Sequence, residues 1–208
     1  VVTSSGAAYG YYADNPAWLD EQDPLRGNPE FPYSDHKRQV EELLADYREK
    51  YPALKQLVLR PGTVLGADTR NLITRLFEGE RLLAVAGSPS PFVFIWDQDV
   101  VGIIEQGVNQ DRSGCFNLAG DGALSIDTLG DLLGKPVIHV PAWLIRSGLW
   151  IGNRLRLTQY VPAQVNFLRY RPVLSNRRLK EEFGYIPRKT SEQVFRFFMA
   201  AARQRGQL

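Results

Sequence analysis

The alternation of a strand, a helix and a strand in the first 62 residues constrains the fold most strongly. Val1–Ser4 and Leu54–Leu59 are short apolar runs that end in Ser-Ser-Gly and Arg-Pro-Gly. Between them, residues 32–50 carry apolar side chains at i, i+3, i+4 and i+7, counted from Val40, which predicts an amphipathic helix. Two strands joined by a helix favour a parallel βαβ unit in an α/β fold, and ligands bind such sheets beyond the carboxyl ends of the strands.

The rest of the chain continues this alternation. Residues 12–32 contain four prolines and no sustained period, which predicts a loop. We expect helices over 68–77, 99–106, 125–133, 142–157 and 191–203, with Asp68 and Asp99 as the N-caps of the first two. Strands are expected over 92–95, 115–118 and 137–140. In the last helix, Val194, Phe197 and Phe198 are expected to face inward.

Composition excludes several classes of protein. A hydrophobic fraction of 44% and a charged fraction of 23% are those of an ordinary globular protein. Cys115 is the only cysteine and His36 and His139 are the only histidines, so no internal disulfide and no bound metal are expected. No transmembrane span and no signal peptide are expected, and the chain fits a cytoplasmic setting.

Charge is distributed unevenly along the chain. Residues 143–208 hold 13 Lys/Arg against 3 Asp/Glu, which leaves 12 against 20 in residues 1–142. The basic part is either a face for an anionic ligand or membrane surface, or a solvated helical surface that balances the acidic part, and we favour the second. No nucleic-acid-binding motif is visible, so no nucleic-acid partner is expected.

Tyr33 and Lys37 stand four residues apart at the start of the helix predicted over 32–50. Residues at this spacing are neighbours on one helix face, and a lysine ammonium favours the phenolate of a nearby tyrosine. Such a tyrosine can take a proton from a secondary alcohol or donate one to a carbonyl, while a nicotinamide cofactor carries the hydride. The pair therefore indicates NAD(P)-dependent chemistry on a small-molecule substrate.

The same spacing occurs in Tyr51 with Lys55 and in Tyr185 with Lys189, so at least two of the three pairs are accidental. Both of these contain an intervening proline, which does not suit a helix interior. Ser5, which ends the first strand, is expected in the same crevice as Tyr33, where its hydroxyl would hold the substrate oxygen. The alternative is that Tyr33 packs on the loop and Ser5 only forms a turn.

Six segments occur in a fixed order: VVTSSGAAYG at 1–10, Tyr33 with Lys37, LVLRPGTVLG at 57–66, Asp99-Val100, Phe116–Leu118 and residues 179–187. They resemble the SSxxxYG, YxxxK, LRPxxVYG, DDV, YNL and LGWxP segments of the extended short-chain dehydrogenases/reductases of the NAD-dependent epimerase/dehydratase family. This order, over nearly the whole chain, is more specific than any one motif.

The resemblance implies the C-terminal part of a Rossmann-like, doubly wound parallel sheet with a smaller α/β substrate-binding subdomain. Residues 1–66 and 96–120 would form the Rossmann part, and residues 67–95 and 121–208 the subdomain. The resemblance also implies roles for Tyr33 as general acid/base, for Lys37 in favouring its phenolate and binding the nicotinamide ribose, and for Ser5 in polarising the substrate oxygen.

The cofactor implied by the resemblance is NAD or NADP, contacted by Ser4, Tyr33, Lys37, Pro61 and Gly62. The substrate would be contacted by Ala7, Thr63, Phe92 and Trp96. A homodimer through the helix that begins near Tyr33 is usual for such folds.

The sequence departs from the family in its glycines. Only Gly120 and Gly122 have the two-residue spacing of the family's cofactor loop, and Ser125 stands at the third glycine position. We therefore expect the glycine-rich part to lie in a missing N-terminal segment. This chain alone is expected to bind NAD(P) weakly and to be inactive.

A second departure bears on the substrate. Members that act on sugar nucleotides usually carry RDFxHVDD, and Phe92 stands at the arginine position of that segment and Trp96 at the histidine position. The helix predicted over 142–157 carries the apolar residues Trp143, Leu144, Leu149, Trp150 and Ile151. These side chains either form one wall of an apolar substrate pocket or pack the helix on the core. We therefore expect a secondary alcohol or ketone on an apolar skeleton.

Two alternatives stay open. One is a nucleotide-sugar epimerase or dehydratase in which late arginines such as Arg146, Arg154 or Arg156 bind the phosphates. The other is a non-catalytic, NAD(P)-sensing scaffold, which would need none of the Ser-Tyr-Lys chemistry.

Overall fold

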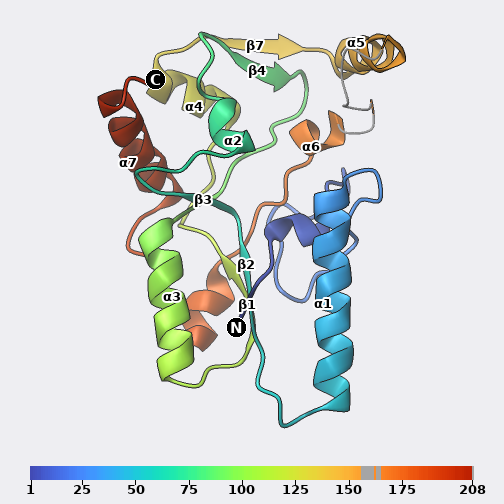
Figure 1. Cartoon of the computed structure of the whole chain (residues 1–208). Helices are drawn as coiled ribbons and strands as arrows, with labels where there is room; N and C mark the ends of the chain where they lie inside the picture. Colours follow the sequence, from blue (N-terminus) through green and yellow to red (C-terminus); the bar gives the residue numbers. More distant parts are fainter. Residues whose placement is uncertain (156–161, 163–164, 208) are drawn as a thin grey trace.

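A three-stranded parallel sheet organises the lower half of the molecule (Figure 1), in a computed structural model that describes residues 1–155, 162 and 165–207. The sheet has the order β1-β2-β6, with β1 at Val2–Thr3, β2 at Leu57–Pro61 and β6 at Gly114–Leu118. Val2 lies opposite Val58, and Leu59 lies opposite Phe116. The helix α1 (Pro32–Lys50) joins β1 to β2, and α3 (Asp97–Asn109) precedes β6 on the other side of the sheet (Figure 1). The predicted parallel βαβ unit and α/β class are confirmed.

The upper half of Figure 1 contains two parallel strand pairs and most of the remaining helices. The pairs are β3 (Thr63–Leu65) with β5 (Phe94–Trp96), and β4 (Leu82–Val85) with β7 (Val137–Val140). The helices are α2 (Leu72–Arg75), α4 (Ile126–Leu133), α5 (Ala142–Arg154), α6 (Val165–Arg169) and α7 (Ser191–Gln204). A 3₁₀ helix, η1 (Gly6–Tyr9), follows β1, and a π-helical turn, η3 (Leu179–Phe183), precedes α7.

Three apolar clusters form the core of the described residues, and two of them lie within these halves. Below, β2 and β6 pack against α3 and η3 through residues such as Leu59, Ile103, Phe116 and Phe183. Above, Phe77, Phe92, Phe94 and Phe195 pack with ring centroids 5.2–6.0 Å apart. Burying a phenylalanine side chain stabilises the fold by ~1.5–3 kcal/mol, so these clusters are major contributors to stability.

The helix α1 presents polar residues to the protein and apolar residues to solvent. Its buried residues are Ser34 and Glu41, whereas Val40, Leu43 and Tyr47 are exposed. The Ser34 hydroxyl donates a hydrogen bond of 2.6 Å to the Ala7 carbonyl. The amphipathic pattern predicted for this helix is real, but its apolar stripe is not what joins it to the sheet.

A buried polar network joins α1 to the sheet instead. The guanidinium of Arg60 on β2 donates to Glu41 at distances of 2.6 to 3.0 Å, and the two side chains are only 6% and 4% exposed. Arg60 also donates to the Tyr9 hydroxyl at 2.8 Å, which donates in turn to Asn117 on β6 at 2.9 Å. The Ser4 hydroxyl completes the network by donating to Glu41 at 2.5 Å. Buried charges are tolerated only when paired and hydrogen-bonded in this way.

Several element predictions need correction. The helix expected over 68–77 is only α2, and Asn71 caps it in place of Asp68, because the Asn71 side chain accepts from the backbone N–H groups of Ile73 and Thr74. Asp99 does not cap α3, which begins at Asp97. It is buried and accepts hydrogen bonds from Tyr185 and Arg188.

The inward face of α7 also differs from the prediction. Val194, Phe195 and Phe198 are buried, whereas Phe197 is 37% exposed and packs its ring edge against Trp96. The buried residues follow the i, i+1, i+4 spacing of one helix face, and Phe197 lies off that face. The predicted end of the helix over 142–157 falls partly outside the described residues, since residues 156 and 157 are not described. No helix among the described residues is long and apolar enough to span a membrane.

Candidate functional site

The carboxyl ends of β1 and β2 create the floor of the site. Because the strands are parallel neighbours, Ser4-Ser5 and Pro61-Gly62 lie at the same edge of the sheet. Ser5 is the N-cap of η1, and its hydroxyl oxygen accepts from the Ala7 N–H at 3.1 Å. This bond fixes the Ser5 side chain and leaves its O–H proton available to a ligand.

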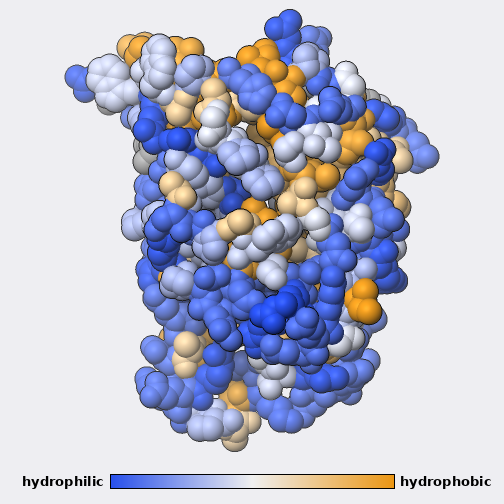
Figure 2. Space-filling view, turned by 180° about the vertical axis from the view of Figure 1, so that it is seen from behind, coloured by the Kyte–Doolittle hydropathy of each residue, from blue (hydrophilic) through white to orange (hydrophobic). Residues whose placement is uncertain are grey.

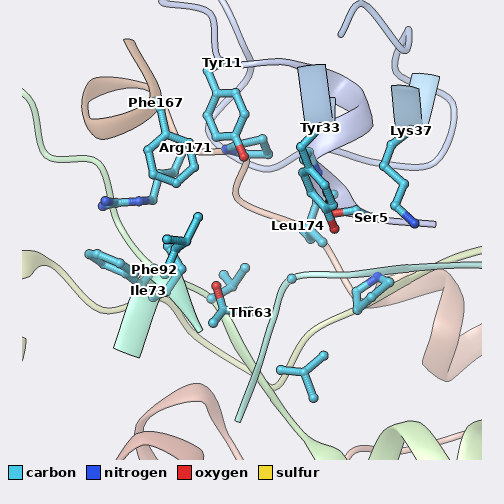
Figure 3. A pocket seen from close by; sticks show the side chains of 18 of the residues that line it. Ser5, Tyr11, Tyr33, Lys37, Thr63, Ile73, Phe92, Phe167, Arg171 and Leu174 are labelled. Atoms are coloured by element: carbon cyan, nitrogen blue, oxygen red, sulfur yellow. The ribbon is translucent and has the colours of Figure 1, made fainter. Parts of the chain in front are cut away.

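Helix α1 brings Tyr33 and Lys37 to the same edge. The Lys37 ammonium donates to the Thr3 carbonyl at 3.1 Å and lies 5.8 Å from the centre of the Tyr33 ring. Tyr33 is 50% exposed, and Figure 3 shows Ser5, Tyr33 and Lys37 together on one side of the cavity. The last residue of β1 thus positions the lysine, and the lysine stands beside the tyrosine.

The two competing Tyr–Lys pairs are held elsewhere. Lys55 forms an ion pair with Asp111 on the surface, and Tyr51 is exposed at the end of α1. Tyr185 donates to Asp99 at 3.0 Å, and the Lys189 ammonium lies 4.3 Å from the centre of the Trp96 ring. Neither pair lines the cavity.

A cavity of about 610 Å³ lies beside Ser5, Tyr33 and Lys37 (Figure 3). It is lined by the predicted residues Ser4, Ser5, Ala7, Tyr33, Lys37, Pro61, Gly62, Thr63 and Phe92. A Cβ on Gly62 would stand 3.0 Å from the Val93 side chain. The backbone between β2 and β3 therefore lies close to Val93, another residue of the cavity lining. The volume is in the range of small-molecule sites.

Trp96 does not line this cavity, contrary to the prediction. It lies at the end of β5 against Phe197, Arg188 and Lys189 and packs on the apolar cluster that contains Phe92 and Phe94. The strand begins only at Phe94, and Phe92, which precedes it, lines the cavity.

The apolar residues of α5 do not wall the cavity either. Trp143, Leu144, Trp150 and Ile151 are 49–67% exposed, and no residue of α5 is buried. Figure 2 shows apolar side chains at the upper end of the molecule, where α5 projects, above a mostly hydrophilic lower half. Both alternatives considered for this helix, a cavity wall and a helix packed on the core, are therefore wrong for these side chains.

The cavity lining also includes residues that were not predicted from the sequence, among them Tyr11, Phe31, Phe167 and Arg171. The rings of Tyr11, Phe31 and Phe167 pack against one another, with centroids 5.0–5.6 Å apart. Burial raises the pKa of the Tyr11 hydroxyl, and the nearby Arg171 only partly offsets this effect. No local pattern marks these residues in the sequence, because they come from two loops and the short α6 region.

Arg171 is a positively charged residue in the part of the cavity lined by Tyr11, Phe92 and Phe167, which we call the upper cavity. Its guanidinium carbon lies 3.8 Å from the centre of the Phe92 ring and 5.7 Å from that of Phe167. Burial lowers the pKa of Arg171 to about 10, and Tyr11 only partly opposes the shift. Among the described residues, its hydrogen bonds are long ones of 3.3 and 3.4 Å to Ser90, and its Nε is buried without a partner.

Two of the arginines considered for phosphate binding, Arg146 and Arg154, lie outside the cavity lining. Arg146 is exposed and donates to Asn166 at 3.2 Å, and Arg154 is exposed at the end of α5. Arg156 lies outside the described residues. Within the described part of the chain, no group of three or more His, Cys, Asp or Glu side chains could hold a metal ion.

Comparisons with known proteins show which sequences and folds this chain resembles. The sequence model described as "NAD dependent epimerase/dehydratase family" matches residues 1–87. An uncharacterized protein of Mycobacterium tuberculosis is 22% identical over 199 residues, which cover 94% of this chain and 52% of that protein, and an uncharacterized protein of Mycobacterium bovis matches to the same extent. The chain thus spans about half the length of the curated relatives it matches.

Solved structures share the fold. A dTDP-glucose 4,6-dehydratase from Bacillus anthracis in complex with NAD aligns with a TM-score of 0.69 at 19% identity, over 97% of this chain and 60% of its own. A UDP-glucose 4-epimerase from Thermotoga maritima with UDP-glucose gives 0.67 at 18% identity, over 98% and 62%. RMD from Pseudomonas aeruginosa, complexed with NADPH, gives 0.64 at 18% identity, over 97% and 65%. The predicted family resemblance and the Rossmann-like α/β fold are confirmed.

Proposed function

We propose that this chain carries the Ser-Tyr-Lys set of an NAD(P)-dependent oxidoreductase or epimerase that acts on a secondary alcohol or carbonyl of an apolar substrate. The observation that carries the proposal is the convergence of Ser5, Tyr33 and Lys37 on one cavity, although a long loop separates Ser5 from the other two in the sequence. The two other Tyr–Lys pairs do not reach it. The epimerase/dehydratase family match supports the same class of chemistry.

The cavity residues next to Tyr33, namely Ser4, Lys37, Pro61 and Gly62, fit the nicotinamide end of NAD or NADP. Lys37 uses one N–H on the Thr3 carbonyl, which leaves its other two protons for ribose hydroxyls. Ser4 and the Pro61-Gly62 wall complete the contact surface that we assign to the cofactor. The cofactor, when bound, supplies or accepts the hydride.

Each member of the set then has a defined task. Ser5 donates its free hydroxyl proton to the substrate oxygen and holds it in place. Tyr33 takes the proton of the alcohol, or donates it to the carbonyl, and the adjacent Lys37 ammonium stabilises the phenolate. Because the Tyr33 side chain is half exposed, its hydroxyl proton can exchange with solvent after each catalytic cycle.

The upper cavity supports an apolar substrate skeleton. Its walls are formed by Tyr11, Phe31, Ile73, Phe92 and Phe167. A nucleotide sugar is the second candidate, because the similar structures include nucleotide-sugar enzymes by name. Binding of a UDP-sugar in preference to apolar alcohols would favour this candidate.

We also propose that the chain forms a homodimer through α1. The exposed stripe of Val40, Leu43, Tyr47 and Tyr51 supports this, since apolar side chains on one helix face are stabilised by a partner surface. Sedimentation of the protein, with Leu43→Lys as the disrupting variant, tests the proposal.

The catalytic proposal is tested by Tyr33→Phe in the full-length protein. Loss of the phenolic proton is expected to lower kcat about 10²–10⁴-fold, since general acid–base groups contribute on that order. The readout is NAD(P)H absorbance with a panel of apolar secondary alcohols and ketones. Tyr51→Phe, which alters a Tyr of the same spacing outside the cavity, is the matched control. Equal rates for wild type and Tyr33→Phe would refute the role of Tyr33.

A further inference from the structure

Arg171 is a cation whose surroundings do not account for its charge. Arg171 forms no ion pair or hydrogen bond with a carboxylate of the described residues, and its Nε is buried without a partner. Its only hydrogen bonds among those residues are the two long ones to Ser90. Arg171 is partly buried, and a charge withdrawn from water is costly unless it is paired, so this arginine is expected to have a partner that the described residues do not supply.

The Nη2 group is the part of this guanidinium that stays accessible to a ligand, since it is not among the buried atoms. Arg171 lines the cavity, and the rings of Phe92 and Phe167 lie near its guanidinium (Figure 3). Aromatic rings stabilise the flat faces of a guanidinium and leave the N–H groups in its plane free to donate. The Nη2 group has no hydrogen-bond partner among the described residues.

The charge of the lining limits what can bind there. Among the residues that the structure describes, the lining contains two basic residues, Lys37 and Arg171, and no Asp or Glu. Lys37 is engaged with Thr3 beside Tyr33, so within that part of the chain Arg171 supplies the positive charge of the upper cavity. A single planar guanidinium matches one planar carboxylate, whereas a diphosphate would bring excess negative charge between apolar walls.

We propose that Arg171 binds a carboxylate group of the substrate, so that the substrate is an acid with an apolar body and a secondary alcohol or carbonyl at the Tyr33 end. This inference rests on the proposed function only in treating the bound acid as substrate. Phe92 forms the surface on which the Arg171 guanidinium rests. The specificity of the upper cavity therefore depends on a residue far along the chain from Phe92.

Benzoate, benzyl phosphate and benzyl alcohol are the probes, titrated into the 208-residue chain and followed by NMR chemical shifts. Benzoate is expected to bind more tightly than both others and to weaken as ionic strength rises. Arg171→Gln is expected to weaken benzoate on the order of 10- to 100-fold, as for loss of a charged hydrogen-bond donor. Arg169→Gln removes the same charge two residues away, outside the lining, and is expected to leave the affinity unchanged.

Three results would overturn the inference: equal benzoate affinity in Arg171→Gln, equal affinity for benzyl alcohol in the wild type, or tighter binding of benzyl phosphate, which would assign the site to phosphate. If Arg171→Gln does not fold, Arg171→Lys keeps the charge without the fork and is expected to weaken benzoate less than tenfold while the salt dependence stays. Tyr33→Phe separates the two proposals. Benzoate binding unaffected by Tyr33→Phe supports the Arg171 site even if the full-length protein shows no dehydrogenase activity.

Discussion

Replacing Glu41 by Gln is expected to destabilise the fold by about 3–5 kcal/mol, the cost of leaving a buried charge without its partner. The Glu41 carboxylate accepts hydrogen bonds from Ser4 at 2.5 Å and from Arg60 at 2.6 to 3.0 Å. Both charged side chains are at most 6% exposed, so solvent cannot replace the lost interaction. A glutamine keeps one acceptor oxygen and presents its amide donors to the donors of Arg60.

The charge of Arg60 will persist in the variant. Burial by itself would lower the pKa of Arg60, but its hydrogen bonds to Glu41 and its interaction with Tyr9 raise the pKa above its usual value. Even without Glu41, an arginine stays protonated at neutral pH. The penalty is therefore expected in full at neutral pH.

Urea unfolding, followed by far-UV circular dichroism, measures the effect. With an m-value of roughly 2–3 kcal/mol per M, the midpoint should fall by about 1–2.5 M. Glu192→Gln is the matched control, because Glu192 pairs with Arg196 on the surface of α7, where both side chains are about half exposed. Its loss should cost at most about 1 kcal/mol.

A Glu41→Gln variant that loses no more stability than Glu192→Gln would refute the reasoning that this network joins α1 to the sheet. The double variant Glu41→Leu with Arg60→Met distinguishes charge from packing. If the unpaired charge is the cause, the double variant should be no less stable than Glu41→Gln, since it removes both charges.

Two further predictions concern the core and the network. Phe195→Ala should lower the free energy of unfolding in urea by about 3–5 kcal/mol, because Phe195 is fully buried. Phe197→Ala should cost clearly less, because Phe197 is partly exposed. Equal losses would contradict the assignment of Phe195 to the buried face of α7. Burial raises the pKa of Glu21 in the folded state above its usual 4.5, and the hydrogen bond from the Asn117 N–H only partly offsets this. Because the folded state then holds the proton more tightly than the unfolded state, the contribution of Glu21 to stability falls as the pH rises from about 4.5 through the raised pKa. Glu21→Gln should remove that fall, and an unchanged pH profile in thermal unfolding would contradict it.

The sequence alone determined the elements that depend on local physics. The apolar runs that form β1, β2 and β6 were identified, and the bounds predicted for the helix over 32–50 are those of α1. The parallel arrangement followed because a helix between two strands leaves little other choice. That arrangement also explains why Ser5 and Gly62, at the ends of adjacent parallel strands, could be expected at one site.

Tertiary structure decided which face of each element is buried and which distant residues meet. Glu41 of α1 is buried because it pairs with Arg60 on β2, and this pairing overrides the apolar stripe of the helix. Trp96 was misplaced because a motif gives the order of residues along a strand and not where the strand begins. Arg171 could not be singled out among 13 basic residues in 143–208, since only packing against Phe92 and Phe167 distinguishes it from a solvated arginine. Patterns along the chain specify local conformation, whereas the pairing of a buried charge depends on contacts that form only when the chain folds.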